Sequence, residues 1–170
     1  MRNCYLLIAV VLLMFSSSVF AQQQEQVQSA FIYHFTKYME WPESKETGDF
    51  IIAVVGNDPI VSHLNTLAAT KKVGVQKIVV KKYSSASDVL NCDMIFLSSK
   101  SSSQLSICLA KAKEYNALLV TEKVGSGKKG SGINFVIIGG KPKFEINEAA
   151  IKASGIKVST KLVQLGIKVG

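Results

Sequence analysis

The chain has 170 residues and a formal net charge of +8, and its single arginine, Arg2, stands beside scattered lysines. A chain of this length predicts one domain. A basic protein can bind nucleic acid, but arginine supplies the bidentate contacts to guanine and phosphate. The composition therefore argues against nucleic-acid binding and favours a solvated, lysine-rich surface.

The first 21 residues have the pattern of a signal peptide. Arg2 forms a short positive region, Tyr5–Phe15 is an almost unbroken apolar run, and Ser16–Ala21 offers a small-residue cleavage site. The apolar run is shorter than the ~20 residues of a membrane span. We therefore expect export, cleavage near Ala21 and no stable membrane insertion, with an N-terminal anchor as the alternative. The processed domain, residues 22–170, keeps 19 lysines against 12 acidic residues.

The next segment predicts an amphipathic helix over residues 22–38. Its apolar residues recur at steps of three and four and form one stripe: Val27, Ala30, Phe31, His34, Phe35 and Tyr38. The helix is expected to end at Glu40-Trp41-Pro42, because the residue before a proline is pushed out of helical angles. A buried strand over 50–55 follows. Asp58 is then expected to cap a helix over 60–70, with Pro59 at its first position.

Strands and helices alternate through the middle of the chain. The expected elements are a strand over 75–83, a serine-capped helix over 84–90, a strand over 92–98, a helix over 101–115 and a strand over 117–121. A Gly/Lys/Ser loop over 122–130 follows them. This spacing is typical of parallel βαβ units.

The stretch Gly132–Asn147 predicts a hairpin that turns at Gly139-Gly140-Lys141-Pro142. Its first strand is apolar on both faces, which predicts cover on both sides. Its second strand alternates, which predicts a half-exposed edge strand.

Capping residues organise the C-terminal part. Asn147 is expected to cap a helix over 148–153, Gly155 to break it, and Ser159 or Thr160 to cap a last helical segment. The predicted fold class is α/β, a three-layer sandwich with a mixed, mostly parallel sheet and a C-terminal antiparallel hairpin.

Two cysteines remain after cleavage. Cys92 is expected to begin a strand, and Cys108 to lie about two turns into the following helix. Strand and helix rise then separate them by more than ~10 Å, whereas a disulfide needs Cα atoms within about 7 Å. We expect two buried, unpaired thiols.

Candidate catalytic and metal-binding residues lack partners in the sequence. His34 lies on the apolar stripe, where a core or boundary histidine is expected, and His63 has no Cys, Asp or Glu at ligand spacing. The serines of 98–103 lack a nucleophile-elbow context. The turn at 56–59 lacks a glycine-rich spacing, and the loop at 125–130 is not followed by the helix that a phosphate-binding loop requires. We expect no catalytic residue, no metal and no cofactor.

Several segments together resemble the YfiR-like family of exported bacterial proteins. They occur in the order of that family and span nearly the whole processed chain: AFIYHFTKYMEWP at 30–42, IAVVGNDP at 52–59, CDMIFL at 92–97, GINF at 132–135, FEIN at 144–147 with Ala149-Ala150, and GIKVS at 155–159.

The resemblance implies a small periplasmic α/β domain without known catalysis. The namesake of the family binds the periplasmic part of an inner-membrane diguanylate cyclase, an enzyme of cyclic-di-GMP signalling, and holds it inactive. It also responds to redox state through disulfides and is sequestered by an outer-membrane lipoprotein. Cys92 matches a family position, but the sequence offers no partner for the bridges of the namesake, which argues against disulfide-based sensing here.

We therefore expect a non-enzymatic periplasmic regulator that binds a membrane-bound signalling protein, a diguanylate cyclase or a sensor kinase, and represses or modulates it. Binding would bury an exposed apolar patch rimmed by lysines. The candidate partner-binding residues are Trp41, Pro42, Lys141, Lys143 and Glu145. The simpler interpretations are a helix-terminal plug for Trp41 and an edge-strand charge for Glu145.

Two other classes stay open. A periplasmic small-molecule sensor would hold its ligand at the carboxyl ends of the strands, near Gly56-Asn57 and Ser98-Ser99. A deep polar pocket there would favour the sensor, and filled strand ends would favour partner binding. A hydrolase would need a polar cluster around His34 or His63. The oligomeric state is also open, with a homodimer among the alternatives.

Overall fold

The computed structural model describes residues 24–170, and the expected signal peptide at 1–21 lies outside them. Within this part of the chain, no helix is long and apolar enough to cross a membrane. Residues 24–35 form the N-terminal helix, which ends three residues before the predicted position. The chain leaves the helix early because β1 (Met39–Glu40) pairs antiparallel with β9 (Lys157–Val158) near the C-terminus.

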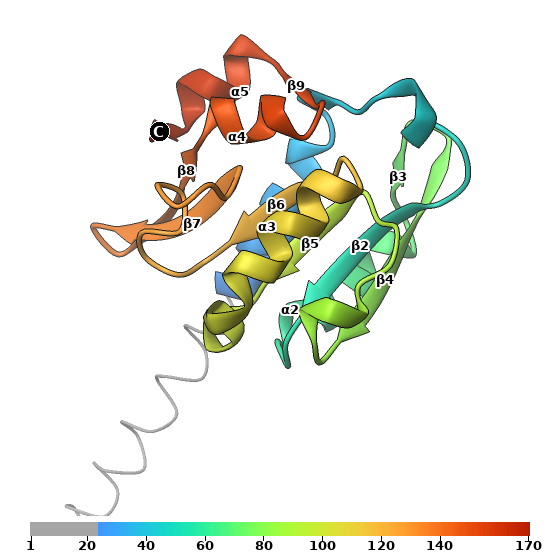
Figure 1. Cartoon of the computed structure of the whole chain (residues 1–170), viewed down its shortest axis with the longest axis horizontal. Helices are drawn as coiled ribbons and strands as arrows, with labels where there is room; N and C mark the ends of the chain where they lie inside the picture. The colour runs from blue at the N-terminus through green and yellow to red at the C-terminus, as the bar shows by residue number, and fades with distance from the viewer. Residues whose placement is uncertain (1–23) are drawn as a thin grey trace, which may run out of the picture.

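The main sheet has eight strands in the order β10-β8-β7-β6-β5-β2-β4-β3 (Figure 1). Their bounds are β2 Phe50–Val55, β3 Lys72–Val73, β4 Gln76–Tyr83, β5 Met94–Leu97, β6 Leu118–Thr121, β7 Ile133–Ile138, β8 Lys141–Ile146 and β10 Ile167–Lys168. The central strands pair in parallel, whereas β3 with β4 and β7 with β8 pair antiparallel. The predicted mixed α/β sheet with a C-terminal hairpin is confirmed.

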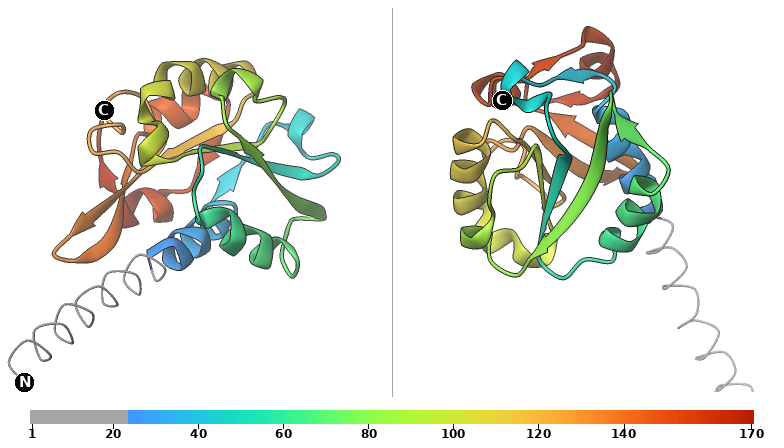
Figure 2. Two further views of the ribbon diagram at one scale, coloured as in Figure 1. Left: turned by 90° about the horizontal axis from the view of Figure 1, so that it is seen from below. Right: turned by 90° about the vertical axis from the view of Figure 1, so that its right-hand side faces the viewer.

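Helices cover both faces of the sheet. The N-terminal helix and α2 (Ile60–Ala68) lie on one side, and α3 (Leu105–Glu114) lies on the other (Figure 2). Three short 3-10 turns join these elements: η1 (Glu43–Lys45), η2 (Ala86–Asp88) and η3 (Ser99–Gln104). Two short helices, α4 (Glu148–Ala153) and α5 (Thr160–Leu165), pack near β8 and β9.

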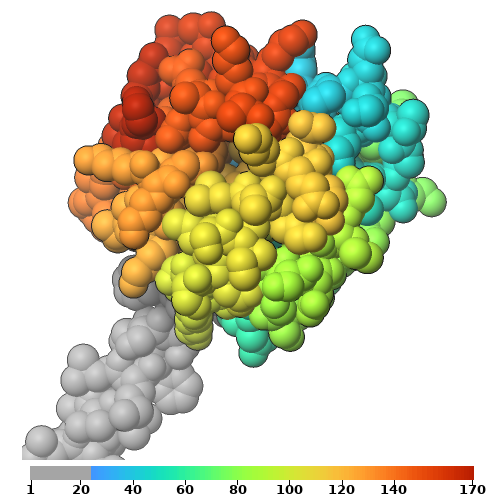
Figure 3. Space-filling view, viewed as in Figure 1, coloured from blue at the N-terminus to red at the C-terminus, as the bar shows by residue number. Residues whose placement is uncertain are grey.

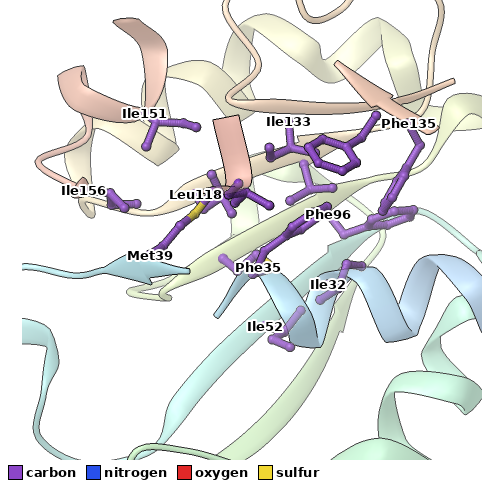
Figure 4. Packing of buried hydrophobic residues seen from close by; sticks show 14 of the residues in the cluster. Ile32, Phe35, Met39, Ile52, Phe96, Leu118, Ile133, Phe135, Ile151 and Ile156 are labelled. Carbon is purple, nitrogen blue, oxygen red and sulfur yellow. The ribbon is translucent and has the colours of Figure 1, made fainter. Parts of the chain in front are cut away.

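Alternation along β5 divides the core into two clusters. Met94 and Phe96 belong to the cluster on the side of the N-terminal helix, which includes Phe35 (Figure 4). Ile95 and Leu97 belong to the cluster on the side of α3. All four β5 side chains are buried, because successive residues of a strand point to opposite faces and both faces are covered.

Several predicted boundaries shift. The helix expected from Ser101 begins at Leu105, because the serines form η3 instead. The helix expected over 84–90 is a single turn, η2, although Ser85 caps it as predicted by accepting the Ser87 N–H. The strand β3 is not predicted by its sequence. It forms because Gly74, at φ 57°, turns the chain back onto β4.

Two predictions about the hairpin are wrong in part: the cover of β7 on both sides and the edge position of β8. Cover on both sides holds for the first half of β7, but Ile137 and Ile138 near the tip are 52% and 47% exposed, because the tip extends past the helices (Figure 2). The second strand, β8, is not the outermost strand, since β10 pairs with its Glu145 and Ile146. Among residues 24–170, the outer edge of β8 has no strand partner over Lys141–Phe144.

The predicted C-terminal caps are confirmed. The Oδ1 atom of Asn147 accepts the Ala150 N–H at 3.0 Å, and Oγ of Ser159 accepts the Leu162 N–H at 3.3 Å. Asn147 also donates its Nδ2 hydrogen to the carbonyl oxygen of Gly127 at 3.0 Å. One buried amide therefore caps α4 and fixes the loop before β7.

Both thiols are buried and unpaired, as predicted. Cys92 and Cys108 lie in the cluster on the side of α3, and each is at most 2% exposed. Burial in this apolar surrounding raises the pKa of Cys92 to about 12 and that of Cys108 to about 11, from 9.0. Neither thiol is a nucleophile at neutral pH.

Candidate partner-binding groove

An apolar groove of about 540 Å³ lies between the N-terminal helix, β8 and α5. These three segments lie side by side in Figure 2 (left). The side chains that form its walls include Phe31, Tyr38, Pro142, Phe144, Leu165 and Ile167. This surface is called the groove below.

Aromatic rings make the floor of the groove. Phe35 and Phe144 meet edge to face with centroids 5.1 Å apart, and Phe31 meets Phe144 at 5.8 Å. Helical spacing places Phe31 and Phe35 on one side of the N-terminal helix. Phe135 of β7 is paired directly with Phe144 and stacks on Phe35. The floor is therefore a packed cluster drawn from three elements.

The walls of the groove expose apolar side chains to solvent. Leu165 is 64% exposed and Ile167 is 37% exposed. Ile137 is paired with Pro142, and directly opposed residues project from the same face of a sheet. The exposed Ile137 side chain therefore extends the apolar surface from the groove toward the hairpin tip.

Lysines surround this apolar surface. The exposed Lys143 lines the groove, and the exposed Lys141 lies beside it at the hairpin turn. Lys161 places its ammonium 5.5 Å from the ring centroid of Tyr38. The groove is thus apolar at its centre and mostly positive at its rim.

The hairpin residues named from the sequence have different environments. Lys141 and Lys143 are exposed, but Glu145 is half-buried. Its Oε2 atom accepts the Nδ2 hydrogen of the buried Asn134 at 2.8 Å, and Asn134 in turn contacts Thr121. The Glu145 carboxylate is therefore held against its neighbouring strand β7, where it orients Asn134.

Trp41 and Pro42 lie on a different surface from the groove. The half-buried indole of Trp41 donates its Nε1 hydrogen to the carbonyl oxygen of Asp93 at 3.0 Å and packs edge to face on Phe50 at 5.0 Å. The half-buried Pro42 packs beside Gly155. The structure thus brings Lys141 and Lys143 together on the hairpin and separates them from Trp41 and Pro42.

A buried carboxylate anchors the segment around Trp41. Asp93 accepts the Ile51 N–H at 2.7 Å and lies 3.7 Å from the ammonium of Lys45. Burial raises the pKa of Asp93, and the Ile51 N–H and Lys45 oppose that rise. These contacts tie the η1 turn to the start of β5, which gives this cluster a structural role.

Neither histidine is part of a polar cluster like the one around Asp93. His34 is exposed and lines the groove, so its predicted place in or at the edge of the core is wrong. The buried side of the N-terminal helix carries Gln28, Ile32 and Phe35 instead, and His34 is left on its open side, next to the groove. His63 is half-buried on α2. Among the residues that the structure describes, no three His, Cys, Asp or Glu side chains are placed to hold a metal ion.

The opposite face of the molecule, over α3, has a smaller hollow of about 240 Å³ beside α4 (Figure 3). Leu109, Ala112 and Ile151 line it. It is less than half the volume of the groove and lacks the exposed aliphatic walls found there. A further hollow, of about 430 Å³, lies beside Trp41 and Phe50, and it is also smaller than the groove. By volume, the groove is therefore the strongest of these three candidates for a functional surface.

The groove residues Phe31, Phe144, Leu165 and Ile167 are not identified as a surface by the sequence. Their apolar spacing indicates which side of each element is buried, and the same pattern would arise in a fully covered core. The one signal that points to them is the pair of flanking lysines, Lys143 and Lys161.

Comparison with known proteins gives a family match over most of the chain. A family model described as YfiR/HmsC-like matches residues 25–167. The matched range includes all but the first residue of the N-terminal helix and the whole main sheet except the last residue of β10. No curated protein matches the chain at a significant level.

Proposed function

The chain belongs to the YfiR/HmsC-like family, a family of periplasmic regulatory domains, and from this premise we propose that it binds a membrane-bound signalling protein and modulates that protein. The partner would be a diguanylate cyclase or a sensor kinase, and this chain would contribute binding without catalysis. The groove is the surface that we assign to this contact.

The observation that supports this assignment is the exposed apolar wall of the groove. Leu165, Ile167 and Ile137 expose 64%, 37% and 52% of their surfaces around an aromatic floor. Isolated exposed apolar residues are ordinary, but a contiguous set around a cavity is typical of an interaction site. Covering such a surface releases the free energy of burial, at about 25 cal/mol per Å² of apolar area.

Charge and backbone geometry indicate the chemistry of the partner. The lysines at the rim, Lys143 and Lys161, favour a segment that carries acidic residues beside apolar ones. The open edge of β8 over Lys141–Phe144 offers backbone groups to an added strand. The partner segment is therefore an apolar stretch with acidic flanks in the periplasmic part of the signalling protein.

Modulation would follow from preferential binding to one state of the partner. A ligand shifts a two-state equilibrium only as far as its affinities for the two states differ. The rigid floor, built by Phe35 and Phe144, presents one fixed shape. The partner state whose segment fits that shape would accumulate.

The experiment is capture of detergent-solubilised inner-membrane proteins by the processed protein, with identification of what is bound. We expect a diguanylate cyclase or sensor kinase, whose capture is lost with Leu165→Glu and kept with Leu90→Glu. Leu90 is the matched control because it is also 64% exposed. Failure to recover any signalling protein, or equal capture by both variants, would contradict the proposal.

A further inference from the structure

Polar side chains converge at the carboxyl ends of β5 and β6, beneath the N-terminal helix. Leu97 is paired with Thr121 in the parallel register, so the next residues, Ser98 and Glu122, leave the two strands at the same level. Gln28 reaches them from the N-terminal helix. Ser98 and Gln28 are 0% and 2% exposed. These three residues, Gln28, Ser98 and Glu122, are called the strand-end site below.

The carboxylate of Glu122 is held in place by two donors. Its Oε1 atom accepts the Ser99 N–H at 2.7 Å, and its Oε2 atom accepts the Nε2 hydrogen of Gln28 at 3.4 Å. The amide of Gln28 cannot be turned over without facing its oxygen toward the carboxylate, and two acceptors repel each other. The Nε2 group of Gln28 therefore has to face Glu122, and its Oε1 atom is the acceptor that remains without a partner.

Two buried polar atoms of this site lack a hydrogen-bond partner. Across residues 24–170, the buried side-chain atoms without a partner are Oε1 of Gln28 and Oγ of Ser98. Ser98 continues the alternation of β5, because its N–H bonds to the Val55 carbonyl like a strand residue. Its side chain therefore projects to the face of Met94 and Phe96, which the N-terminal helix covers.

Such a pair is unusual in a folded protein, since buried polar groups are almost always satisfied by protein, water or ligand. Tight packing at the end of β2 leaves no room for a ligand on that side of Ser98. A Cβ on Gly56 would contact Cβ of Ser98 at 3.1 Å and collide with Oγ of Ser101, so the end of β2 is filled. The two unpaired atoms therefore belong to the β5–β6 side of the strand ends, next to Glu122.

The charged group of the site itself is the carboxylate of Glu122. Burial and the carboxylates of Asp58 and Glu122 raise the pKa of Glu25, while His63 and Lys100 oppose that rise. Glu122 therefore interacts with a further carboxylate, Glu25, on the N-terminal helix. An anionic carboxylate beside unpaired acceptors favours a cationic ligand over an anionic one. A metal ion is not favoured, because the residues described hold no suitable set of three ligands.

We propose that the strand-end site binds the primary ammonium group of a small organic cation. A primary ammonium has three N–H donors and no acceptor. The three donors match Gln28 Oε1, Ser98 Oγ and the Glu122 carboxylate, two of which have an unused acceptor. This site is independent of the groove, because none of its residues lines the groove.

The test is an amide NMR titration of the processed protein with ethylammonium chloride, and with tetramethylammonium chloride as the control. Both probes carry one positive charge, but tetramethylammonium has no N–H donor. We expect saturable shifts at Gln28, Ser98, Ser99 and Glu122 with ethylammonium alone. No saturable shift with ethylammonium means that the site holds at most a buried water, and equal shifts with the two probes mean unspecific charge attraction. Each of these results overturns the proposal.

Two variants locate the binding. Ser98→Ala and Gln28→Met each remove one unpaired acceptor, and each is expected to weaken ethylammonium binding about tenfold. Ser103→Ala and Gln26→Met make the same chemical changes at exposed positions and should leave the affinity unchanged. Ser98→Ala adds no atoms and breaks no hydrogen bond, so this variant should fold. It therefore tests the site even if Gln28→Met fails to fold. Unchanged affinity in Ser98→Ala would overturn the assignment.

Discussion

The ring of Phe35 meets the ring of Phe144 edge to face, with centroids 5.1 Å apart. Phe35 belongs to the N-terminal helix and Phe144 to β8, so the contact joins the first part of the described chain to its C-terminal hairpin. Both side chains are buried, at 0% and 4% exposure. The pair closes the core on one side and forms the floor of the groove on the other.

Phe144→Leu should therefore destabilise the protein without unfolding it. The change removes the aromatic contacts with Phe35 and Phe31 and leaves a partly filled space. We expect the free energy of unfolding, measured in urea, to fall by about 1–3 kcal/mol. Ile138→Val, at the exposed hairpin tip, should stay within about 0.5 kcal/mol of the unchanged protein. Equal effects of the two changes would contradict this account.

Leu165→Glu separates binding from folding. The side chain is 64% exposed, so the free energy of unfolding should change by less than about 0.5 kcal/mol. Capture of the signalling partner should fall by at least about tenfold, because a carboxylate enters an apolar contact and repels acidic flanks. Circular dichroism and urea unfolding check the first expectation, and quantitative pull-down checks the second. Loss of stability together with capture would show a folding defect instead.

Asn147 has two structural roles that substitution can separate. Asn147→Ala removes the cap of α4 and the hydrogen bond to the Gly127 carbonyl, and should lower the free energy of unfolding by about 2 kcal/mol. Asn147→Asp keeps a capping oxygen but faces a second carboxylate oxygen toward the Gly127 carbonyl, so the loss should be at least as large as in Asn147→Ala. Ser159→Ala removes one cap alone and should cost about 1 kcal/mol. A larger loss in Ser159→Ala than in Asn147→Ala would refute this ranking.

Ser98→Ala should stabilise the ligand-free protein. The hydroxyl of Ser98 is fully buried and has no partner among residues 24–170, and leaving such a group unsatisfied costs about 1–3 kcal/mol. Its removal should raise the free energy of unfolding by about 1 kcal/mol, with Ser103→Ala as the neutral control. A lower melting temperature in Ser98→Ala would show that the hydroxyl is already satisfied.

Because the pKa values of the two thiols are raised in the native state, we expect the protein to lose stability at alkaline pH. The native pKa values of about 12 for Cys92 and about 11 for Cys108 lie above the ordinary 9.0. Below pH 9 both states hold these protons, so the full stability is present. As the pH rises above 9, the unfolded chain releases protons that the native state keeps, and stability falls by up to about 1.4 kcal/mol per pH unit for each thiol.

The measurement is urea unfolding at several pH values between 8 and about 11, and Cys92→Ala should reduce the slope. Native thiols should also resist a thiol reagent at pH 8, because a pKa near 12 leaves roughly one thiol in ten thousand as thiolate. Fast labelling of the native protein would contradict the burial of both side chains.

The sequence predicts those parts of the fold that depend on neighbouring residues. The strand Phe50–Val55, the caps at Asn147 and Ser159 and the turn at Gly139-Gly140 follow from alternation, local hydrogen bonding and backbone angles. The family follows from the same kind of local pattern, because the segments that resemble it are the end of the N-terminal helix, strands, turns and caps. Its match over residues 25–167 confirms that resemblance.

Both candidate sites depend on contacts between distant parts of the chain. Gln28 meets Glu122 across 94 positions, and the cover of β8 by β10 depends on how the last residues return to the sheet. An apolar stripe such as the one with Phe31 and Phe35 indicates burial but does not say which neighbour covers it. Amphipathic periodicity is a local property, so the sequence by itself determines most of the elements and the buried faces of the central strands. It misplaces the buried side of the N-terminal helix, where Gln28 is buried and His34 is exposed. Only tertiary packing decides which apolar surface stays open and which polar atoms are left unpaired, because both depend on the space that remains after every element has found its partner.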